Sequence, residues 1–148
     1  MNLMAVTNNN LLVEAIGVAN WLQMRYEPAL RWEDPVGYCA WYINHGFLGK
    51  VFSEDGKSVV AMVAMRPVKN LGDGAVPYRY DPDGDFIHID LLVGDGHPLA
   101  IGALAATFKY RFGPRKSVCY FRRGEERLRV HDYDRFFKNM TRTLRKAS

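Results

Sequence analysis

The apolar positions at the start of the chain recur with the period of α-helices. After the potential caps at Asn8 to Asn10, apolar side chains return at i, i+4, i+7 and i+11, namely at Leu11, Ala15, Val18 and Leu22. A first helix is therefore expected to end near Tyr26, because Pro28 disfavours helical geometry in the residue before it. The pair Asp34-Pro35 predicts a second helix that runs to about residue 44.

The middle of the chain changes to the patterning of β-strands. Asp55-Gly56 separates two strand-like runs, residues 49–54 and 57–66, and is a strong signal for a β-hairpin. Residues 69–84 are polar and interrupted by glycine and proline, which predicts a loop. The run DFIHIDLLVG over residues 85–94 predicts a third strand.

The C-terminal part predicts a helix, a strand and a last helix. Pro98 suits the first turn of a helix that Gly113-Pro114 ends, with Ile101, Leu104, Ala105 and Phe108 on one face. Residues 117–122 form a strand-like run, and apolar positions from 133 to 144 share one helical face. The predicted order is helix, helix, strand, strand, strand, helix, strand, helix (ααβββαβα). We expect one α/β (α+β) domain over residues 1–148, with a mixed, mostly antiparallel central sheet flanked by helices.

Composition restricts the class of protein. The 148 residues are 48% hydrophobic and 24% charged, which suits one domain with a buried core. The longest apolar run is strand-sized and the N-terminus lacks a signal-peptide pattern, so we expect a soluble, cytoplasmic protein without a membrane segment. Cys39 and Cys119 lack the spacing of zinc ligands and are expected to be reduced core residues. The acidic turn at residues 81–85 lacks the EF-hand pattern, so no metal is expected.

Charge is unevenly distributed along the chain. Residues 1–108 carry 7 Lys/Arg and 12 Asp/Glu, whereas residues 109–148 carry 13 and 4. This basic C-terminal face could hold phosphates or an acidic protein partner. No RRM signature, GXXG clamp or zinc knuckle accompanies it, so no motif supports nucleic-acid binding.

The strand predicted at residues 85–94 carries a polar pair. Side chains alternate along a strand, so His88 and Asp90 should share one face. The other face should carry Ile87, Ile89, Leu91 and Val93. A histidine beside a carboxylate can accept a proton from an attacking amine or hydroxyl. The alternative is that both residues only hydrogen-bond to loop groups.

The segment LLVGDGHPLAIGAL, residues 91–104, resembles the strand end, glycine loop and helix start with which GNAT-type acyltransferases hold acyl-CoA. A helix N-terminus offers N–H groups and a positive dipole end to phosphate. The resemblance spans roughly residues 10–140 and implies a GNAT-like domain. It implies binding of acetyl-CoA or another acyl-CoA by Leu92, Val93, Gly94, Gly96, His97 and Gly102. His97, Pro98 and Leu99 stand where the family has Arg or Gln and a further glycine.

Within this superfamily the pattern is most similar to the toxin-activating lysine acyltransferases, which use acyl-carrier protein as donor. The similarity includes two helices, the hairpin FLGKVFSEDGKSVVAMVAM and the strand FIHIDLLVG. His88 occupies the position at which this family has an aspartate on the strand, and Asp90 follows two residues later on the same face. The family also has a histidine between the first two helices, and this sequence has no histidine at that position. The superfamily resemblance implies that Tyr133 could reprotonate a leaving thiolate, although its apolar stripe favours core packing.

Three functions follow from these patterns. The first is transfer of an acyl group from acyl-CoA or acyl-carrier protein to an amine or hydroxyl acceptor, with His88 or Asp90 as base. The second is a catalytically inactive binding or assembly protein, such as a phage or mobile-element factor, favoured by the altered loop and by the absence of the family's final two strands. The third is a small basic nucleic-acid-binding module. An open gap between strands 85–94 and 117–122 would favour an enzyme. A gap filled by the side chain of Tyr120 or Phe121 would favour an assembly protein.

Overall fold

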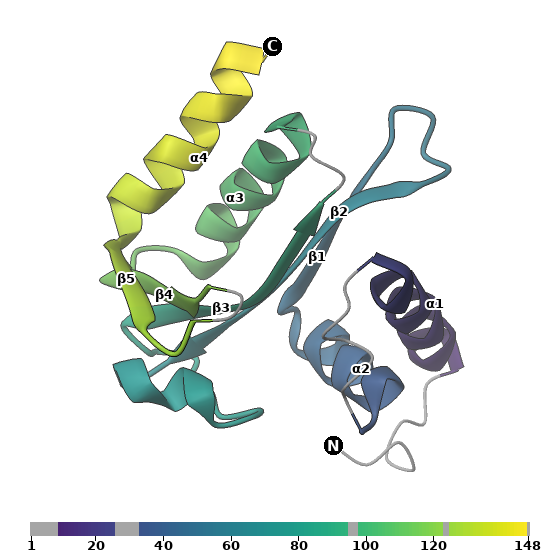
Figure 1. The fold of residues 1–148 in the computed structure, drawn as a ribbon, viewed down its shortest axis with the longest axis horizontal. Coiled ribbons are helices and arrows are strands. Elements are labelled where there is room, and N and C mark those ends of the chain that lie inside the picture. The colour runs from purple at the N-terminus through teal and green to yellow at the C-terminus, as the bar shows by residue number, and fades with distance from the viewer. Residues whose placement is uncertain (1–8, 26–32, 95–97, 123–124, 148) are drawn as a thin grey trace. The chain divides into compact units, whose positions relative to one another are not determined.

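The computed structural model in Figure 1 describes residues 9–25, 33–94, 98–122 and 125–147. The elements are, in chain order, α1 (Asn9–Arg25), α2 (Pro35–His45), β1 (Leu48–Phe52), β2 (Val59–Val68), the 3-10 helix η3 (Leu71–Ala75), β3 (Phe86–Gly94), α3 (Pro98–Phe112), β4 (Ser117–Phe121), β5 (Leu128–Asp132) and α4 (Tyr133–Ala147). They form two compact units, Met1–Leu48 and Gly49–Ser148. Within the described residues, none of these helices combines the length and the apolar character that crossing a membrane requires.

The first unit contains the two helices that the sequence predicts. α1 and α2 pack against each other. Of the predicted stripe, Ala15, Val18 and Leu22 are buried and Leu11 is half-buried, and Ala19 is buried with them. The carboxylate of Asp34 accepts a hydrogen bond of 2.8 Å from the N–H of Gly37 and so caps α2. α2 ends at Gly46, which has a φ of 74° that glycine adopts without strain.

The second unit is built on a five-stranded sheet in the order β1-β2-β3-β4-β5. β2 pairs with β3 and β4 with β5 in antiparallel fashion, whereas β3 and β4 are parallel and are joined through α3. The hairpin at Asp55-Gly56 and the mixed, mostly antiparallel α/β class are therefore confirmed. The predicted order is wrong in that β5 adds a strand before α4, and the predicted loop at residues 69–84 contains the 3-10 helix η3. The sequence of β5, LRVHD, alternates apolar and polar residues only from Leu128 to His131, and this short, strongly charged run was not recognised as a strand.

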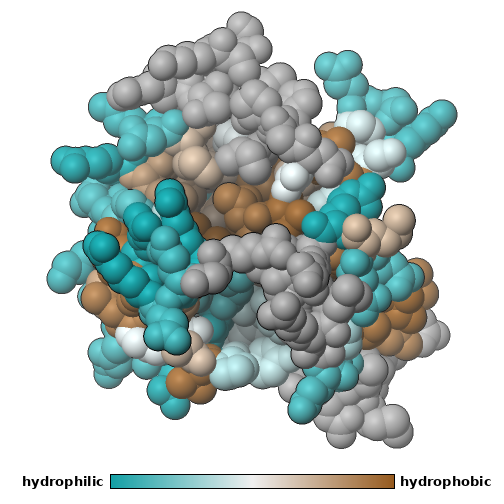
Figure 2. Space-filling model, in the orientation of Figure 1, coloured by the Kyte–Doolittle hydropathy of each residue, from teal (hydrophilic) through white to brown (hydrophobic). Residues whose placement is uncertain are grey.

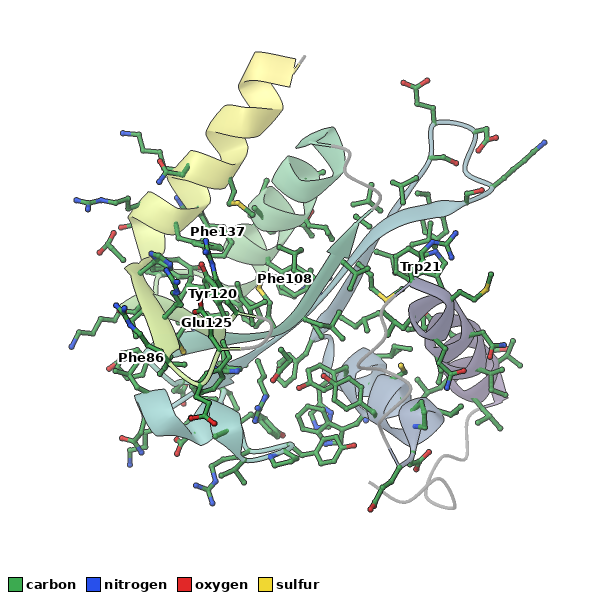
Figure 3. The ribbon with its side chains drawn as sticks, in the orientation of Figure 1. Trp21, Phe86, Phe108, Tyr120, Glu125 and Phe137 are labelled. Atoms are coloured by element: carbon green, nitrogen blue, oxygen red, sulfur yellow. The ribbon has the colours of Figure 1, made fainter. Side chains whose placement is uncertain are left out.

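α3 and α4 cover one face of this sheet (Figure 1). The buried side chains between helices and strands are Ala61, Val63, Met65, Ile87, Ile89, Leu104, Ala105, Phe108, Val118, Tyr133 and Phe137. Figure 3 labels Phe108 of α3 and Phe137 of α4 within this layer. The helical faces predicted for α3 and α4 are thus confirmed where their side chains are described.

β3 departs from simple alternation at Asp90. The register passes from Met65 opposite Ile89 to Ala64 opposite Leu91, so Asp90 is an extra residue in the ladder. Because paired residues share a face, Leu91 and Val93 lie on the same face as Ala64 and Met62, away from α3 and α4. The prediction that Leu91 and Val93 share a face with Ile87 and Ile89 is therefore wrong, since a bulge shifts the period by one residue.

Candidate functional site

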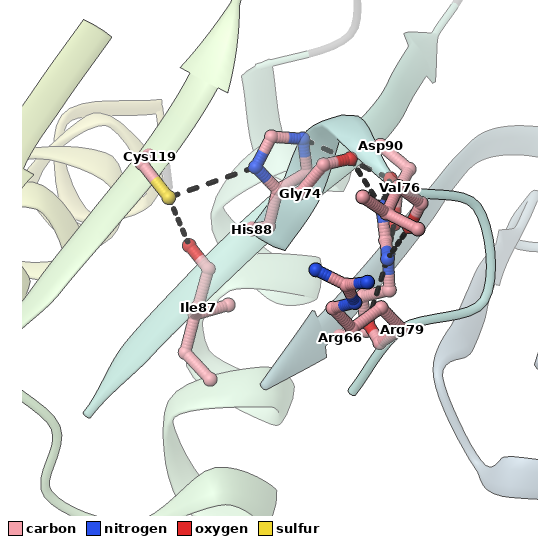
Figure 4. Close-up of polar contacts among 8 residues, drawn as sticks. All are labelled: Arg66, Gly74, Val76, Arg79, Ile87, His88, Asp90 and Cys119. Carbon is pink, nitrogen blue, oxygen red and sulfur yellow. Dashed lines mark hydrogen bonds and ion pairs between the residues drawn. The ribbon is translucent and has the colours of Figure 1, made fainter. Parts of the chain in front are cut away.

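The face of the sheet opposite α3 and α4 carries a compact group of polar side chains (Figure 4). Three neighbouring strands supply them, and we call the four residues the sheet network: Arg66 of β2, His88 and Asp90 of β3, and Cys119 of β4. Arg66 is 2% exposed, His88 3% and Cys119 0%. Ionisable groups are seldom buried unless they are paired, so these contacts decide what the group can do.

Arg66 holds the network to the segment that includes η3. Its Nε and Nη2 donate to the Asp90 carboxylate at 3.0 Å, which forms a two-pronged ion pair. Its Nη1 donates to the carbonyls of Val76 at 2.7 Å and Arg79 at 2.6 Å, and its Nη2 also donates to the carbonyl of Gly74. One guanidinium therefore joins β2, β3 and the segment after η3.

His88 lies between Asp90 and Cys119. Its Nε2 is 3.8 Å from Oδ1 of Asp90, and its Nδ1 is 3.6 Å from Sγ of Cys119. The backbone of Gly74 packs on the ring so closely that an added methyl group would overlap the imidazole. Burial lowers the pKa of His88 below its ordinary 6.5, while Asp90 raises it and Arg66 lowers it further. The imidazole is consequently neutral near pH 7 and can accept a proton.

Cys119 is a buried, protonated thiol beside that base. Its S–H donates to the carbonyl of Ile87 at 3.7 Å, while Sγ lies 3.6 Å from Nδ1 of His88. Burial raises the pKa of Cys119 to about 11, the charge of Asp90 raises it too, and Arg66 opposes both. The expectation of reduced, buried cysteines is confirmed for Cys119 and for Cys39. The thiol nevertheless has a neighbour that an ordinary core cysteine lacks, because His88 can take its proton.

The network lies where the two parallel strands separate. β3 and β4 pair only at Phe86 with Ser117, Ile87 with Val118, and His88 with Cys119. β3 then continues to Gly94 without β4 beside it. The ring of Phe121 lies 6.0 Å from that of His88, whereas the Tyr120 hydroxyl lies 3.1 Å from Nε2 of His131. Phe121 therefore borders this separation and Tyr120 turns away from it.

The structure brings together only some of the residues that the sequence singles out. His88 and Asp90 meet in the network, but Tyr133 is buried with the helices on the other face, where its hydroxyl donates to the Lys109 carbonyl at 3.5 Å. Burial raises the pKa of Tyr133. Of the proposed donor-binding residues, Leu92 and Gly94 are exposed, Val93 is buried, Gly102 is buried within α3, and Gly96 and His97 lie outside the described residues.

Sequence reasoning missed three participants. Arg66 is the one charged residue in the otherwise apolar run of β2, which is a signal for a buried ion pair that pattern analysis could have used. Cys119 and Gly74 carry no such signal, because only the fold brings them to His88. Among the residues that the structure describes, no group of three or more His, Cys, Asp or Glu could hold a metal ion.

The basic face is partly visible in Figure 2, where hydrophilic side chains gather on the side that holds β5 in Figure 1. Exposed cationic residues of this region are Arg122, Arg127, Arg135 and Lys138. Arg129 instead pairs with Glu125 at 3.2 Å, which lowers the pKa of that carboxyl. The surface thus retains positive charge after its internal pairing.

The chemistry that the network can perform is proton transfer between a thiol and an imidazole oriented near a carboxylate. Such an arrangement serves nucleophilic and general-base catalysis alike. Comparisons with known proteins do not add a family, because no family model, no curated protein and no solved structure matches the chain.

Proposed function

We propose that the protein transfers an acyl group from acyl-CoA or acyl-carrier protein to an amine or hydroxyl acceptor. One observation carries the proposal: a neutral, buried imidazole lies at the last pair of β3 and β4 before these parallel strands separate. Acyl transfer from a thioester needs a base that removes a proton from the attacking group. The resemblance of residues 91–104 to a donor-binding loop adds independent support.

The contacts of the network divide the roles of His88 and Asp90. Arg66 holds the Asp90 carboxylate through two nitrogens, so both carboxylate oxygens already accept hydrogen bonds from the guanidinium. His88 is therefore the base in this proposal. Asp90, 3.8 Å from Nε2, stabilises the imidazolium that forms when His88 gains a proton.

The donor would lie along the end of β3. No residue of β4 pairs with that part of the strand. Leu92 and Gly94 are exposed there, and their pairing with Val63 and Ala61 places them on the face of α3, so a donor would pass the strand edge to reach His88. α3 begins at Pro98, four residues after the strand ends, and a helix N-terminus is a favourable place for a phosphate. The basic face, with Arg122 and Arg127, would attract the phosphates of CoA or the acidic surface of a carrier protein.

A second candidate is a binding or assembly protein that keeps this network for stability alone. The observation in its favour is the closure of the site, since Gly74 packs on His88 and Arg66 fixes the segment that carries Gly74. A network that never opens would contribute to folding and to nothing else. The two candidates differ in whether the protein binds and consumes an acyl donor.

Calorimetric titration with acetyl-CoA, dodecanoyl-CoA and an acylated carrier protein tests the proposal, together with an assay of thiol release. We expect one of these donors to bind, and His88→Gln to keep binding while thiol release falls roughly 10²-fold or more. His131→Gln is the matched control, because His131 is exposed on β5 and should not alter release. Absence of binding by all three donors up to millimolar concentration would instead favour the assembly protein.

A further inference from the structure

We infer that Cys119 is the nucleophile of this reaction and carries the acyl group as a thioester between donor and acceptor. This inference rests on the proposed function and specifies its path. Nδ1 of His88 lies 3.6 Å from Sγ of Cys119. In the tautomer that carries its proton on Nε2, on the side of Asp90, Nδ1 is the acceptor and the thiol is the group that it can activate. Cysteine nucleophiles are activated when a thiol, an imidazole and a carboxylate lie in this order in space.

The geometry fits that role at each contact. Cys119 and His88 are the last cross-strand pair of β4 and β3, which fixes their separation through the sheet. Asp90 lies on the far side of the ring from the thiol, 3.8 Å from Nε2, and Arg66 fixes its orientation. β3 and β4 thus hold the three reacting groups, and β2 supplies the Arg66 that orients one of them, as precise positioning requires.

The chemical steps balance without a further reactant. Nδ1 of His88 takes the thiol proton as Sγ of Cys119 attacks the carbonyl carbon of the donor thioester. The carbon–sulfur bond of the donor breaks, and the donor thiolate takes the proton from His88. The acceptor amine or hydroxyl then attacks the Cys119 thioester and gives its proton to His88, which returns it to Sγ as the acylated acceptor leaves.

η3 and the residues after it cover the imidazole, so access to His88 from this side requires their movement. Gly74 lies on the imidazole, and the carbonyls of Gly74, Val76 and Arg79 are all held by Arg66. Closure of this segment would exclude water from the thioester and so limit its hydrolysis. Exposed apolar side chains at Val76 and Phe121 border the same region and could contact an acyl chain.

Cys39 provides a matched comparison within the chain. It is also free and buried, and burial raises its pKa to about 12, but it lies on α2 in the other unit. The two thiols therefore share burial and high pKa, and they differ in the imidazole that contacts Cys119. Any reactivity of Cys119 that Cys39 lacks follows from His88.

The test is intact-mass spectrometry of the full chain after incubation with acetyl-CoA, dodecanoyl-CoA or acylated carrier protein, without an acceptor. We expect a mass increase of one acyl group, mapped to Cys119 and removed by neutral hydroxylamine. Cys119→Ser should form no thioester and should slow thiol release roughly 10³-fold, whereas Cys39→Ser should behave as the wild type. Mapping in the wild type decides the matter even if Cys119→Ser folds poorly.

The outcomes separate this inference from the proposed function. Thiol release at the wild-type rate in Cys119→Ser, with no thioester on the wild type, would overturn the inference and leave acyl transfer by direct attack in place. Neither donor binding nor thiol release in the wild type would overturn both. A thioester on Cys39 as well as Cys119 would also overturn the inference, because it would show non-specific acylation.

Discussion

The two faces of the sheet in the second unit are both buried but are built from different chemistry. The face under α3 and α4 is apolar, with Phe108 and Phe137 fully buried between helices and strands. The opposite face also buries apolar residues such as Met62 and Leu91, but beneath the segment of η3 it buries the charged Arg66 and the polar His88. Apolar packing tolerates substitutions of similar volume, whereas a buried charge network depends on every partner.

This contrast teaches where stability and function lie in the protein. The apolar face gains its stability from area removed from water, which many side chains share. The stability of the polar face depends largely on one guanidinium, because Arg66 donates hydrogen bonds to Asp90 and to three backbone carbonyls. Loss of one partner there leaves several groups unsatisfied at once.

The largest effect is expected for Arg66→Met. Methionine keeps the length of the side chain but leaves Asp90 as an unpaired carboxylate and removes the donors to three carbonyls. Breaking a buried ion pair in this way costs about 3–5 kcal/mol of the free energy of unfolding. Urea unfolding followed by circular dichroism measures the loss.

Two further variants make this prediction specific. Arg79→Met removes an exposed arginine whose ion pair with Asp73 spans 3.5 Å, and it should change the free energy of unfolding by less than about 1 kcal/mol. The double variant Arg66→Met with Asp90→Leu removes the stranded charge and should be more stable than Arg66→Met alone. Equal losses for Arg66→Met and Arg79→Met would contradict the assigned role of the ion pair.

A smaller effect is expected for Gly74→Ala. The new methyl group would overlap the His88 ring, so η3 must shift, at about 1–3 kcal/mol for a forced overpacking. The shift should admit water and raise the pKa of His88 toward its ordinary value, as an NMR titration would show. Gly72→Ala lies in the same 3-10 helix with open space around the added methyl group, and it should leave that pKa unchanged.

The same contrast explains what the sequence could predict. Helical period located the apolar faces of α1, α3 and α4, because a stripe of Leu104, Ala105 and Phe108 is a local property. Strand alternation correctly placed His88 and Asp90 together. It misplaced Leu91 and Val93, since a bulge depends on pairing with β2 and leaves no mark in the sequence of β3.

The rest of the network was beyond local pattern. Arg66, Gly74 and Cys119 come from β2, η3 and β4, and each is separated from His88 by more than ten residues of sequence. Only the register of β2 with β3 and of β3 with β4 brings them together. β5 was missed for a related reason, because an edge strand needs no continuous apolar pattern.

The pH dependence of stability should report on the polar face. The pKa of His88 is lowered in the folded protein, so below its ordinary 6.5 the unfolded chain binds a proton that the folded chain excludes. The free energy of unfolding is therefore unaffected by the titration of His88 above pH 6.5. It decreases as the pH falls from 6.5 toward the lowered pKa of His88 in the folded protein. Urea midpoints between pH 7.5 and about pH 5 should therefore fall less in His88→Gln than in the wild type. His131→Gln should retain the wild-type decrease, and equal decreases in all three proteins would exclude a buried neutral His88.

The smallest effect is expected for Tyr133→Phe on the apolar face. The hydroxyl that it removes makes one long hydrogen bond, 3.5 Å to the Lys109 carbonyl, while the ring remains packed against Phe137. The free energy of unfolding should therefore fall by no more than about 1 kcal/mol. Because Tyr133 and His88 lie on opposite faces of the sheet, the NMR-measured pKa of His88 should not change. A shifted His88 pKa would show that the two faces are coupled through β3, and that the apolar side participates in the chemistry of the polar one.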